Sequence, residues 1–154
     1  MKWALPLFAL GAAVLGTGAL AQTDNKLAPY YPTPNTIVER MLNFAGLKAG
    51  ETMYDLGSGD GRIVIIAAQK YHAKAIGVEL DNDLAISSAA RIKKLGLEKT
   101  ARIIHGDVLT QNYADADVIT VYLLPESNIK MRPVLEATVK KGTRSEERRV
   151  GKEC

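Results

Sequence analysis

The residues best suited to binding a small molecule lie in one glycine-rich stretch, DLGSGDG at residues 55–61. Besides Leu56, this stretch holds two acids, three glycines and a serine: Asp55, Gly57, Ser58, Gly59, Asp60 and Gly61. Glycine permits a positive φ and has no Cβ, so a ligand can lie directly against the backbone of such a turn. A tight joint between a strand and a helix also needs glycines, so the neighbouring residues must decide between a binding turn and a structural one.

Those neighbours exclude two familiar phosphate-binding turns. A dinucleotide-binding turn reads G-x-G-x-x-G, but the sixth position counted from Gly57 is Arg62. A P-loop needs Gly-Lys-Ser/Thr, which the stretch does not contain. Asp55 and Asp60 would also repel a pyrophosphate at the start of a helix. The two carboxylates favour a ligand that is cationic where it meets the turn, and S-adenosylmethionine, with its ammonium and sulfonium groups, meets that requirement.

Two further acids follow later apolar runs of the chain. Glu79 lies 20 residues after Gly59, where a carboxylate can accept hydrogen bonds from both ribose hydroxyls. Asp107 is placed to take the adenine amino group, with Leu80 or Val108 against the ring face. A single acid is more often solvated or a helix cap. Acids at the ends of three successive strands indicate one shared site.

Strands and helices are expected to alternate along the chain. Four apolar runs, mostly rich in β-branched residues, predict strands at residues 52–56, 75–80, 101–105 and 117–123. Residues 62–71 have the pattern of a helix. This alternation predicts an α/β fold, a Rossmann-like doubly wound parallel sheet with helices on both faces. Ligands bind such sheets at the carboxyl ends of the strands, where the glycine turn and both later acids fall.

Capping residues and prolines set the other helix bounds. A first helix is expected to be capped by Asn35 or Thr36, and a later one by Asp83. The last helix is predicted to start near Arg132, because Pro133 suits the first turn of a helix but not its interior.

Several segments together resemble the class I methyltransferases that use S-adenosylmethionine. More narrowly, they are similar to the small protein-lysine methyltransferases whose animal members modify the c subunit of ATP synthase or the adenine nucleotide translocase. The matching segments are PYYPTPNTIVERML, YDLGSGDGRIVIIAA, GVEL, IHGDVL and VYLLPESN, and they cover residues 29–143 almost continuously. The resemblance implies that the glycine turn holds the methionine portion of the cofactor, Glu79 the ribose and Asp107 the adenine. It also implies that Tyr31 and Thr33 fold over the cofactor.

Residues 122–126 (YLLPE) follow the last predicted strand, where the resemblance places the amine that receives the methyl group. The expected catalytic residues are Tyr122, Pro125 and Glu126, and the expected partner is a protein lysine. Tyr122 is equally consistent with a core aromatic side chain. Transfer from a sulfonium to a neutral amine needs alignment, exclusion of water and loss of the amine's proton rather than a strong base.

The first 21 residues have the features of an export signal: Lys2, an apolar run over residues 4–20 and the cleavage pattern Ala-Leu-Ala. A cleaved signal peptide predicts an exported domain, periplasmic or extracytoplasmic. An uncleaved segment would be a membrane anchor and the expected membrane contact. Residues 22–35 are polar and proline-rich, which predicts an extended lead-in.

The final stretch, residues 144–154 (RSEERRVGKEC), has seven charged residues and no hydrophobic period, and it resembles the translation of a sequencing adapter. The methyltransferase domain is therefore expected to span residues 36–143 and the native chain to continue beyond it. In the family the sheet has the strand order 3-2-1-4-5-7-6. The sequence predicts a C-terminally truncated sheet with the first four strands only, and a bare edge at the fourth.

Charge and histidine content give no support to other ligands. Residues 22–143 hold 15 Lys+Arg and 14 Asp+Glu, a net charge of +1, so no nucleic-acid partner is expected. No metal is expected either, because His72 and His105 have no second ligand at metal spacing. Two alternatives stay open: a nicotinamide-dependent oxidoreductase, which Arg62 and the flanking acids disfavour, and a non-catalytic exported binding protein that retains the fold.

Overall fold

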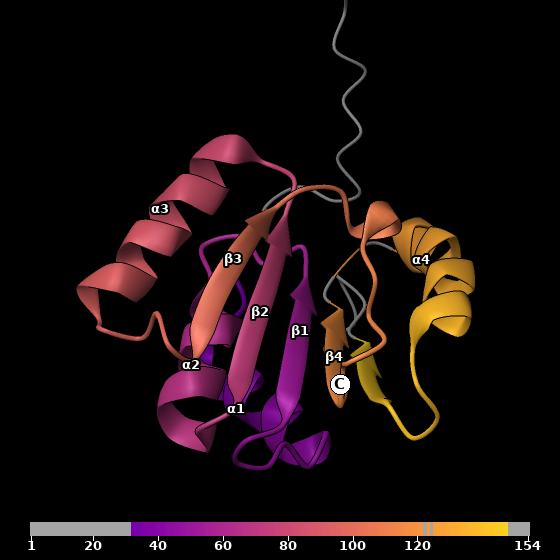
Figure 1. The fold of residues 1–154 in the computed structure, drawn as a ribbon, viewed down its shortest axis with the longest axis horizontal. Helices are drawn as coiled ribbons and strands as arrows, with labels where there is room; N and C mark the ends of the chain where they lie inside the picture. Colours follow the sequence, from indigo (N-terminus) through magenta and orange to yellow (C-terminus); the bar gives the residue numbers. More distant parts are fainter. Residues whose placement is uncertain (1–31, 122, 124, 148–154) are drawn as a thin grey trace, which may run out of the picture.

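The structure, a computed structural model, describes residues 32–121, 123 and 125–147. Its elements follow in the order α1 (Asn35–Phe44), β1 (Thr52–Leu56), α2 (Arg62–Tyr71), β2 (Lys74–Glu79), α3 (Asn82–Lys94), β3 (Ala101–His105), the 3-10 turn η1 (Val108–Thr110), β4 (Val118–Val121), α4 (Pro125–Thr138) and β5 (Arg144–Glu147). The strands form one parallel sheet in the order β3-β2-β1-β4-β5 (Figure 1). The predicted α/β fold is confirmed, and this order matches the first five positions of the family's sheet.

Each face of the sheet carries its own apolar core, because successive residues of a strand point to opposite faces. On one face Met53 of β1 and Val118 of β4 pack with α1, α2 and Ile92 of α3. On the other face Tyr54 and the neighbouring apolar residues of β4 pack with η1 and with Met131 of α4. Figure 1 shows α3 beyond β3 on the left and α4 beyond β4 on the right. Helices therefore cover both faces, as the doubly wound arrangement requires.

The predicted side-chain caps were wrong. No side chain caps α1, which begins after Pro34, whose carbonyl accepts hydrogen bonds from two N–H groups of the first turn. The cap of α3 is Asp81 rather than Asp83: Asp81 Oδ1 accepts hydrogen bonds from the N–H of Asp83 (3.0 Å) and of Leu84 (3.2 Å). Asp83 lies in the first turn instead, where its negative charge still favours the helix N-terminus.

The prediction for the last helix was wrong at its start. α4 begins at Pro125 and runs through Pro133, which lies inside it. A proline in a helix interior removes one backbone hydrogen bond and crowds the preceding turn. Packing outweighs that cost: Met131 is 1% exposed in the core, and Leu135 and Val139 pack against the same cluster.

The prediction of four strands was also wrong, because β5 pairs with the edge of β4. Val118 lies in register with Arg144, and the N–H of Arg144 donates to the carbonyl of Asp117 (3.0 Å). The Arg144 guanidinium donates to the carbonyl of Gly46 (2.8 Å) and to Glu51 Oε2 (2.6 Å). The high charge of this segment suggested a tail without a fold, yet an unpaired strand edge accepts backbone pairing whatever the side chains. The origin of residues 144–154 stays a prediction.

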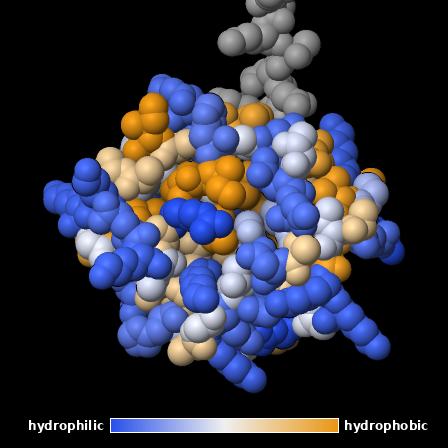
Figure 2. Space-filling model, in the orientation of Figure 1, coloured by the Kyte–Doolittle hydropathy of each residue, from blue (hydrophilic) through white to orange (hydrophobic). Residues whose placement is uncertain are grey.

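The surface that faces the viewer in Figure 1 is mixed. Figure 2 shows apolar surface in its upper middle and mainly polar surface below. The large apolar side chains that are exposed among the described residues are Phe44, Ile86, Leu95 and Ile129. Within the same residues, no helix is long and apolar enough to span a membrane. The predicted signal peptide lies outside the described residues, so export stays a prediction.

Arg144→Ala is expected to lower the free energy of unfolding by about 1 kcal/mol, because it removes two charge-assisted hydrogen bonds that are only partly screened by water. The matched control is Arg132→Ala, which removes a largely exposed ion pair of α4 and should cost less than Arg144→Ala. Urea unfolding measures both. Equal effects would mean that the side-chain contacts of Arg144 add nothing to stability.

Candidate functional site

The glycine turn joins β1 to α2 at the carboxyl edge of the sheet. Its first N–H, that of Gly57, donates to the carbonyl of Val78 at the end of β2 (2.9 Å). Gly57, Gly59 and Gly61 all have positive φ, at 79°, 53° and 73°. A Cβ at Gly57 would also lie 2.9 Å from a methyl carbon of Leu123. The conformation therefore requires glycine and keeps backbone, rather than side chains, at this part of the edge.

Ser58 packs the turn against β2. Its side chain is buried, and its Oγ has no hydrogen-bond partner among the described residues. A Cβ at Gly77 of β2 would come within 2.5 Å of Ser58 Oγ. Gly77 is thus needed for the turn to approach the sheet, a role that no pattern in the sequence indicates.

Glu79, at the end of β2, ties the turn to the following loop. It is 8% exposed, its Oε2 accepts a hydrogen bond from the N–H of Gly59 (2.7 Å), and its Oε1 accepts one from the N–H of Asp81 (2.8 Å). Each carboxylate oxygen has two lone pairs, so acceptor capacity remains for the two ribose hydroxyls of the prediction. The structure adds a second role, because Glu79 also shapes the turn that it faces.

Asp55, the last acid of β1, is buried at 1% exposure. Its Oδ1 accepts a hydrogen bond from Thr120 Oγ1 of β4 (2.8 Å), whereas Oδ2 is buried and has no partner among the described residues. Burial raises the pKa of the Asp55 carboxyl to about 7; the Thr120 hydrogen bond opposes this rise, and the negative charges of Glu79 and Asp60 add to it. A buried carboxyl with one unused oxygen is suited to a positively charged ligand group.

Asp60 faces a pair of arginines. Arg62 Nε lies 2.9 Å from Asp60 Oδ1 and Arg62 Nη2 lies 2.8 Å from Oδ2, which is the bidentate geometry, and Arg91 Nη1 lies 3.5 Å from Oδ2. Partial burial alone would raise the pKa of Asp60, but these guanidinium groups hold it below its ordinary value. The negative charge of Asp60 is thus largely compensated, and the charge argument against an anionic ligand rests on Asp55 and Glu79.

The same arginine holds Thr33 of the lead-in against the turn. Arg62 Nη1 donates to the carbonyl of Thr33 (2.9 Å), and Thr33 is buried at 4% exposure. Thr33 therefore lies next to the glycine turn, as the resemblance implied. Tyr31, the other lead-in residue predicted to contact the cofactor, lies outside the described residues.

Asp107 reaches the same edge from β3. The neighbouring N–H, that of Gly106, donates to the carbonyl of Glu79 (2.9 Å), which places the Asp107 loop beside the end of β2. Asp107 Oδ1 accepts a hydrogen bond from the N–H of Leu109 (2.8 Å) and caps η1. Val108 is buried and Leu80 is partly buried. The structure therefore brings together the predicted ribose and adenine residues.

The structure describes only part of the segment that is predicted to hold the methyl acceptor. β4 is parallel to β1 and ends at Val121 at the carboxyl edge of the sheet, and α4 begins at Pro125, four residues later. Glu126 lies in the first turn of α4 and is exposed. Tyr122 lies outside the described residues, so its predicted role is untested.

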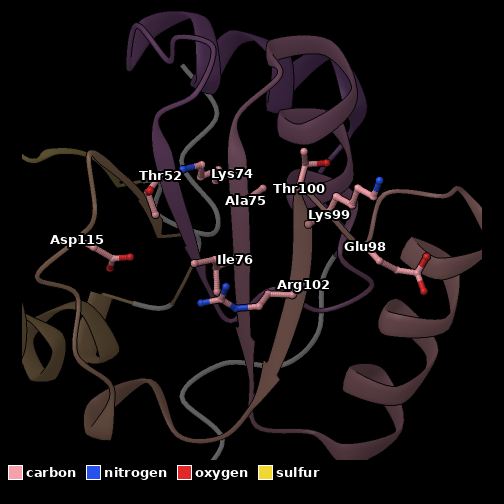
Figure 3. A pocket seen from close by; sticks show the side chains of 10 residues that line it. Thr52, Lys74, Ala75, Ile76, Glu98, Lys99, Thr100, Arg102 and Asp115 are labelled. Atoms are coloured by element: carbon pink, nitrogen blue, oxygen red, sulfur yellow. The ribbon is translucent and has the colours of Figure 1, made fainter.

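A cavity of about 210 Å³ lies away from the glycine turn (Figure 3). Its lining includes Thr52, Lys74, Thr100 and Arg102, which belong to the first halves of β1, β2 and β3 or directly precede them. Parallel strands all start at one edge, so this cavity lies toward the edge opposite the glycine turn. The position of the cavity separates it from the candidate site.

Residues 55–145 match the family described as the ANTKMT methyltransferase domain. The chain belongs to this family of class I S-adenosylmethionine-dependent methyltransferases. A protein-lysine N-methyltransferase of Saccharolobus islandicus is 40% identical over 117 residues, which cover 75% of this chain and 73% of that protein. A lysine N-methyltransferase of Mus musculus, named for the C subunit of ATP synthase, is 29% identical over 116 residues, which cover 75% of this chain but 46% of that protein. The chain thus spans about half the length of the mouse relative.

A solved structure that is similar to this chain holds a ligand. The RNA methyltransferase of Salinibacter ruber, in complex with S-adenosyl-L-homocysteine, is 39% identical with a TM-score of 0.74, over 76% of each chain. The predicted family, fold and cofactor are therefore confirmed. The residues of this edge fit S-adenosylmethionine. The unused Oδ2 of Asp55 can accept a hydrogen bond from the cofactor's ammonium group, and Glu79 can accept hydrogen bonds from its ribose hydroxyls. The glycine turn leaves room beside the backbone for the methionine portion of the cofactor.

Cofactor binding should strengthen as the pH rises from 5.5 to 7.5. The raised pKa of Asp55 keeps the carboxyl protonated below about pH 7, and the cofactor's positive amino group favours the ionised form, so binding at low pH must release a proton. An α-amino group itself titrates only near pH 7.7–8.0, roughly above this range. Calorimetry with S-adenosylhomocysteine in buffers of different ionisation enthalpy measures both affinity and proton release. Asp55→Asn should remove the dependence, and an unchanged profile in that variant would contradict the assignment.

Glu79→Ala should weaken binding of S-adenosylhomocysteine by roughly 30-fold, about 2 kcal/mol, because the variant loses the ribose acceptor and frees one buried and one partly buried N–H group. Asp83→Ala is the matched control, an exposed acid four residues away that only faces the helix N-terminus. It should bind almost as wild type. Similar affinities for the two variants would exclude Glu79 from the site.

Proposed function

We propose that this enzyme N-methylates lysine side chains of a protein. The observation that carries the proposal is the 40% identity to the protein-lysine N-methyltransferase of Saccharolobus islandicus, over nearly three quarters of both chains. The animal lysine N-methyltransferases named for the C subunit of ATP synthase support it at lower identity. The described site is compatible with a lysine substrate, because α4 starts close to the carboxyl edge of the sheet, where the acids predicted to bind the cofactor lie.

The chain's own residues supply binding and alignment for this reaction. The cofactor brings a methyl group already activated by its sulfonium. A neutral amine nitrogen attacks that methyl carbon, so the N–C bond forms, the C–S bond breaks and the sulfur leaves as the thioether of S-adenosylhomocysteine. Asp55, Glu79 and the glycine turn fix the cofactor at the sheet edge. The lysine must be neutral to attack, and its proton passes to water. Glu126, exposed at the start of α4, can hold the incoming cationic lysine before that step.

An RNA substrate is the second candidate, because the Salinibacter ruber structure at 39% identity is described as an RNA methyltransferase. Binding to an RNA backbone favours a surplus of basic side chains. Residues 22–143 have a net charge of only +1, from 15 Lys+Arg and 14 Asp+Glu. This balance favours a protein substrate, and one experiment can compare the two.

Incubation of the enzyme with labelled S-adenosylmethionine should transfer label to lysine-containing protein and not to RNA. The matched control is the same protein with its lysines blocked by acetylation, which leaves no nucleophilic amine and should accept little label. Mass spectrometry of the product should place the added methyl groups on lysine. Label in RNA alone, or label that survives the blocking of lysine, would contradict the proposal.

A further inference from the structure

The strand register surrounds Asp55 with two particular neighbours. Asp55 of β1 pairs with Gly77 of β2 on one side and with Thr120 of β4 on the other. Residues in register on parallel strands point to the same face, so the Thr120 side chain lies next to the Asp55 carboxyl. The two side chains lie on the face of the sheet that α2 covers, near the strand ends from which the glycine turn starts.

Thr120 is fully buried, and its hydroxyl has a preferred acceptor. Thr120 Oγ1 lies 2.8 Å from Asp55 Oδ1 and 3.3 Å from the backbone carbonyl oxygen of Tyr54. A hydroxyl has one hydrogen to donate, and the shorter distance identifies the carboxyl oxygen as its acceptor. Asp55 Oδ2 is left without a partner among the described residues.

We propose that Thr120 is a positioning residue for cofactor binding, which holds Asp55 Oδ1 so that Oδ2 is presented to the cofactor's positively charged amino group. The proposal rests on the cofactor site and not on the nature of the methyl acceptor. It concerns a residue that contacts Asp55 rather than the reacting atoms.

The surroundings make the hydroxyl's contribution large. Glu79 of β2 and Asp60 of the turn place negative charge near Asp55, and Asp60 is compensated by Arg62 and Arg91. Within the part of the chain that the structure describes, no cationic side chain pairs with Asp55. Among the residues that the structure describes, the Thr120 hydroxyl is therefore the side-chain donor that stabilises the ionised form of Asp55.

Thr120 can also remain hydrogen-bonded when Asp55 is protonated. The carboxyl proton can then be donated to Thr120 Oγ1, and the hydroxyl can turn its own hydrogen to the carbonyl of Tyr54. Valine, which has the same shape but no hydroxyl, loses both arrangements. Serine keeps the hydroxyl.

The test measures S-adenosylhomocysteine affinity as a function of pH for Thr120→Val and Thr120→Ser. Thr120→Val should bind about tenfold more weakly at pH 7 and should move the midpoint of the pH dependence upward by about one unit. Thr120→Ser should restore most of both. Ile119→Val is the control, a buried change on the same strand that points to the opposite face. It should lower the melting temperature without moving the pH midpoint.

A second comparison separates positioning from mere stability. In an Asp55→Asn background, adding Thr120→Val should cost little further affinity, because the residue acts through the carboxyl. Thr120→Ala offers the same comparison if the valine variant does not fold. The proposal is overturned if the variant that lacks the hydroxyl keeps the wild-type pH midpoint, or if it costs as much affinity in the Asp55→Asn background as beside the native acid.

Discussion

The arrangement of the site depends on one carboxylate that bridges two loops. Glu79 Oε2 accepts a hydrogen bond from the N–H of Gly59 and Oε1 accepts one from the N–H of Asp81, so one carboxylate holds both the turn after β1 and the loop after β2. Two N–H groups would otherwise lose their acceptor in a largely buried place, at a cost of roughly 1–3 kcal/mol each. The bridge therefore fixes the cofactor's turn before any cofactor binds, which lowers the ordering cost of binding.

A buried negative potential gives this edge its preference for a cationic ligand. Asp55 and Glu79 are both buried, and the acid next to them, Asp60, is compensated by Arg62. An uncompensated carboxylate in such a place either takes up a proton or binds a positive group. We propose that the ammonium of S-adenosylmethionine supplies that charge. On this proposal the placement of the acids gives selectivity for the cofactor, and the cofactor's own sulfonium activates the methyl group.

Local pattern along the chain predicted much of this structure, whereas strand register could not be predicted from it. β1, α2 and β3 have the predicted bounds, and the acids at the strand ends gather as expected. Thr120 and Gly77 were missed because their importance comes from lying beside Asp55, which no pattern within one strand reveals. β5 was missed because its high charge is typical of a tail, although the unpaired edge of β4 accepts it. Arg62 served only to exclude a dinucleotide turn, although it also binds the carbonyl of Thr33.

The central claim is that the carboxyl edge of this sheet binds S-adenosylmethionine through Asp55 and Glu79. The most direct measurement is a crystal structure of the protein with S-adenosylhomocysteine. We expect the cofactor's amino nitrogen within hydrogen-bond distance of Asp55 Oδ2, at about 2.7–3.2 Å, and both ribose hydroxyls on Glu79. A cofactor whose amino group lies away from Asp55, or whose ribose contacts other residues while Glu79 bonds only to backbone, would contradict the account.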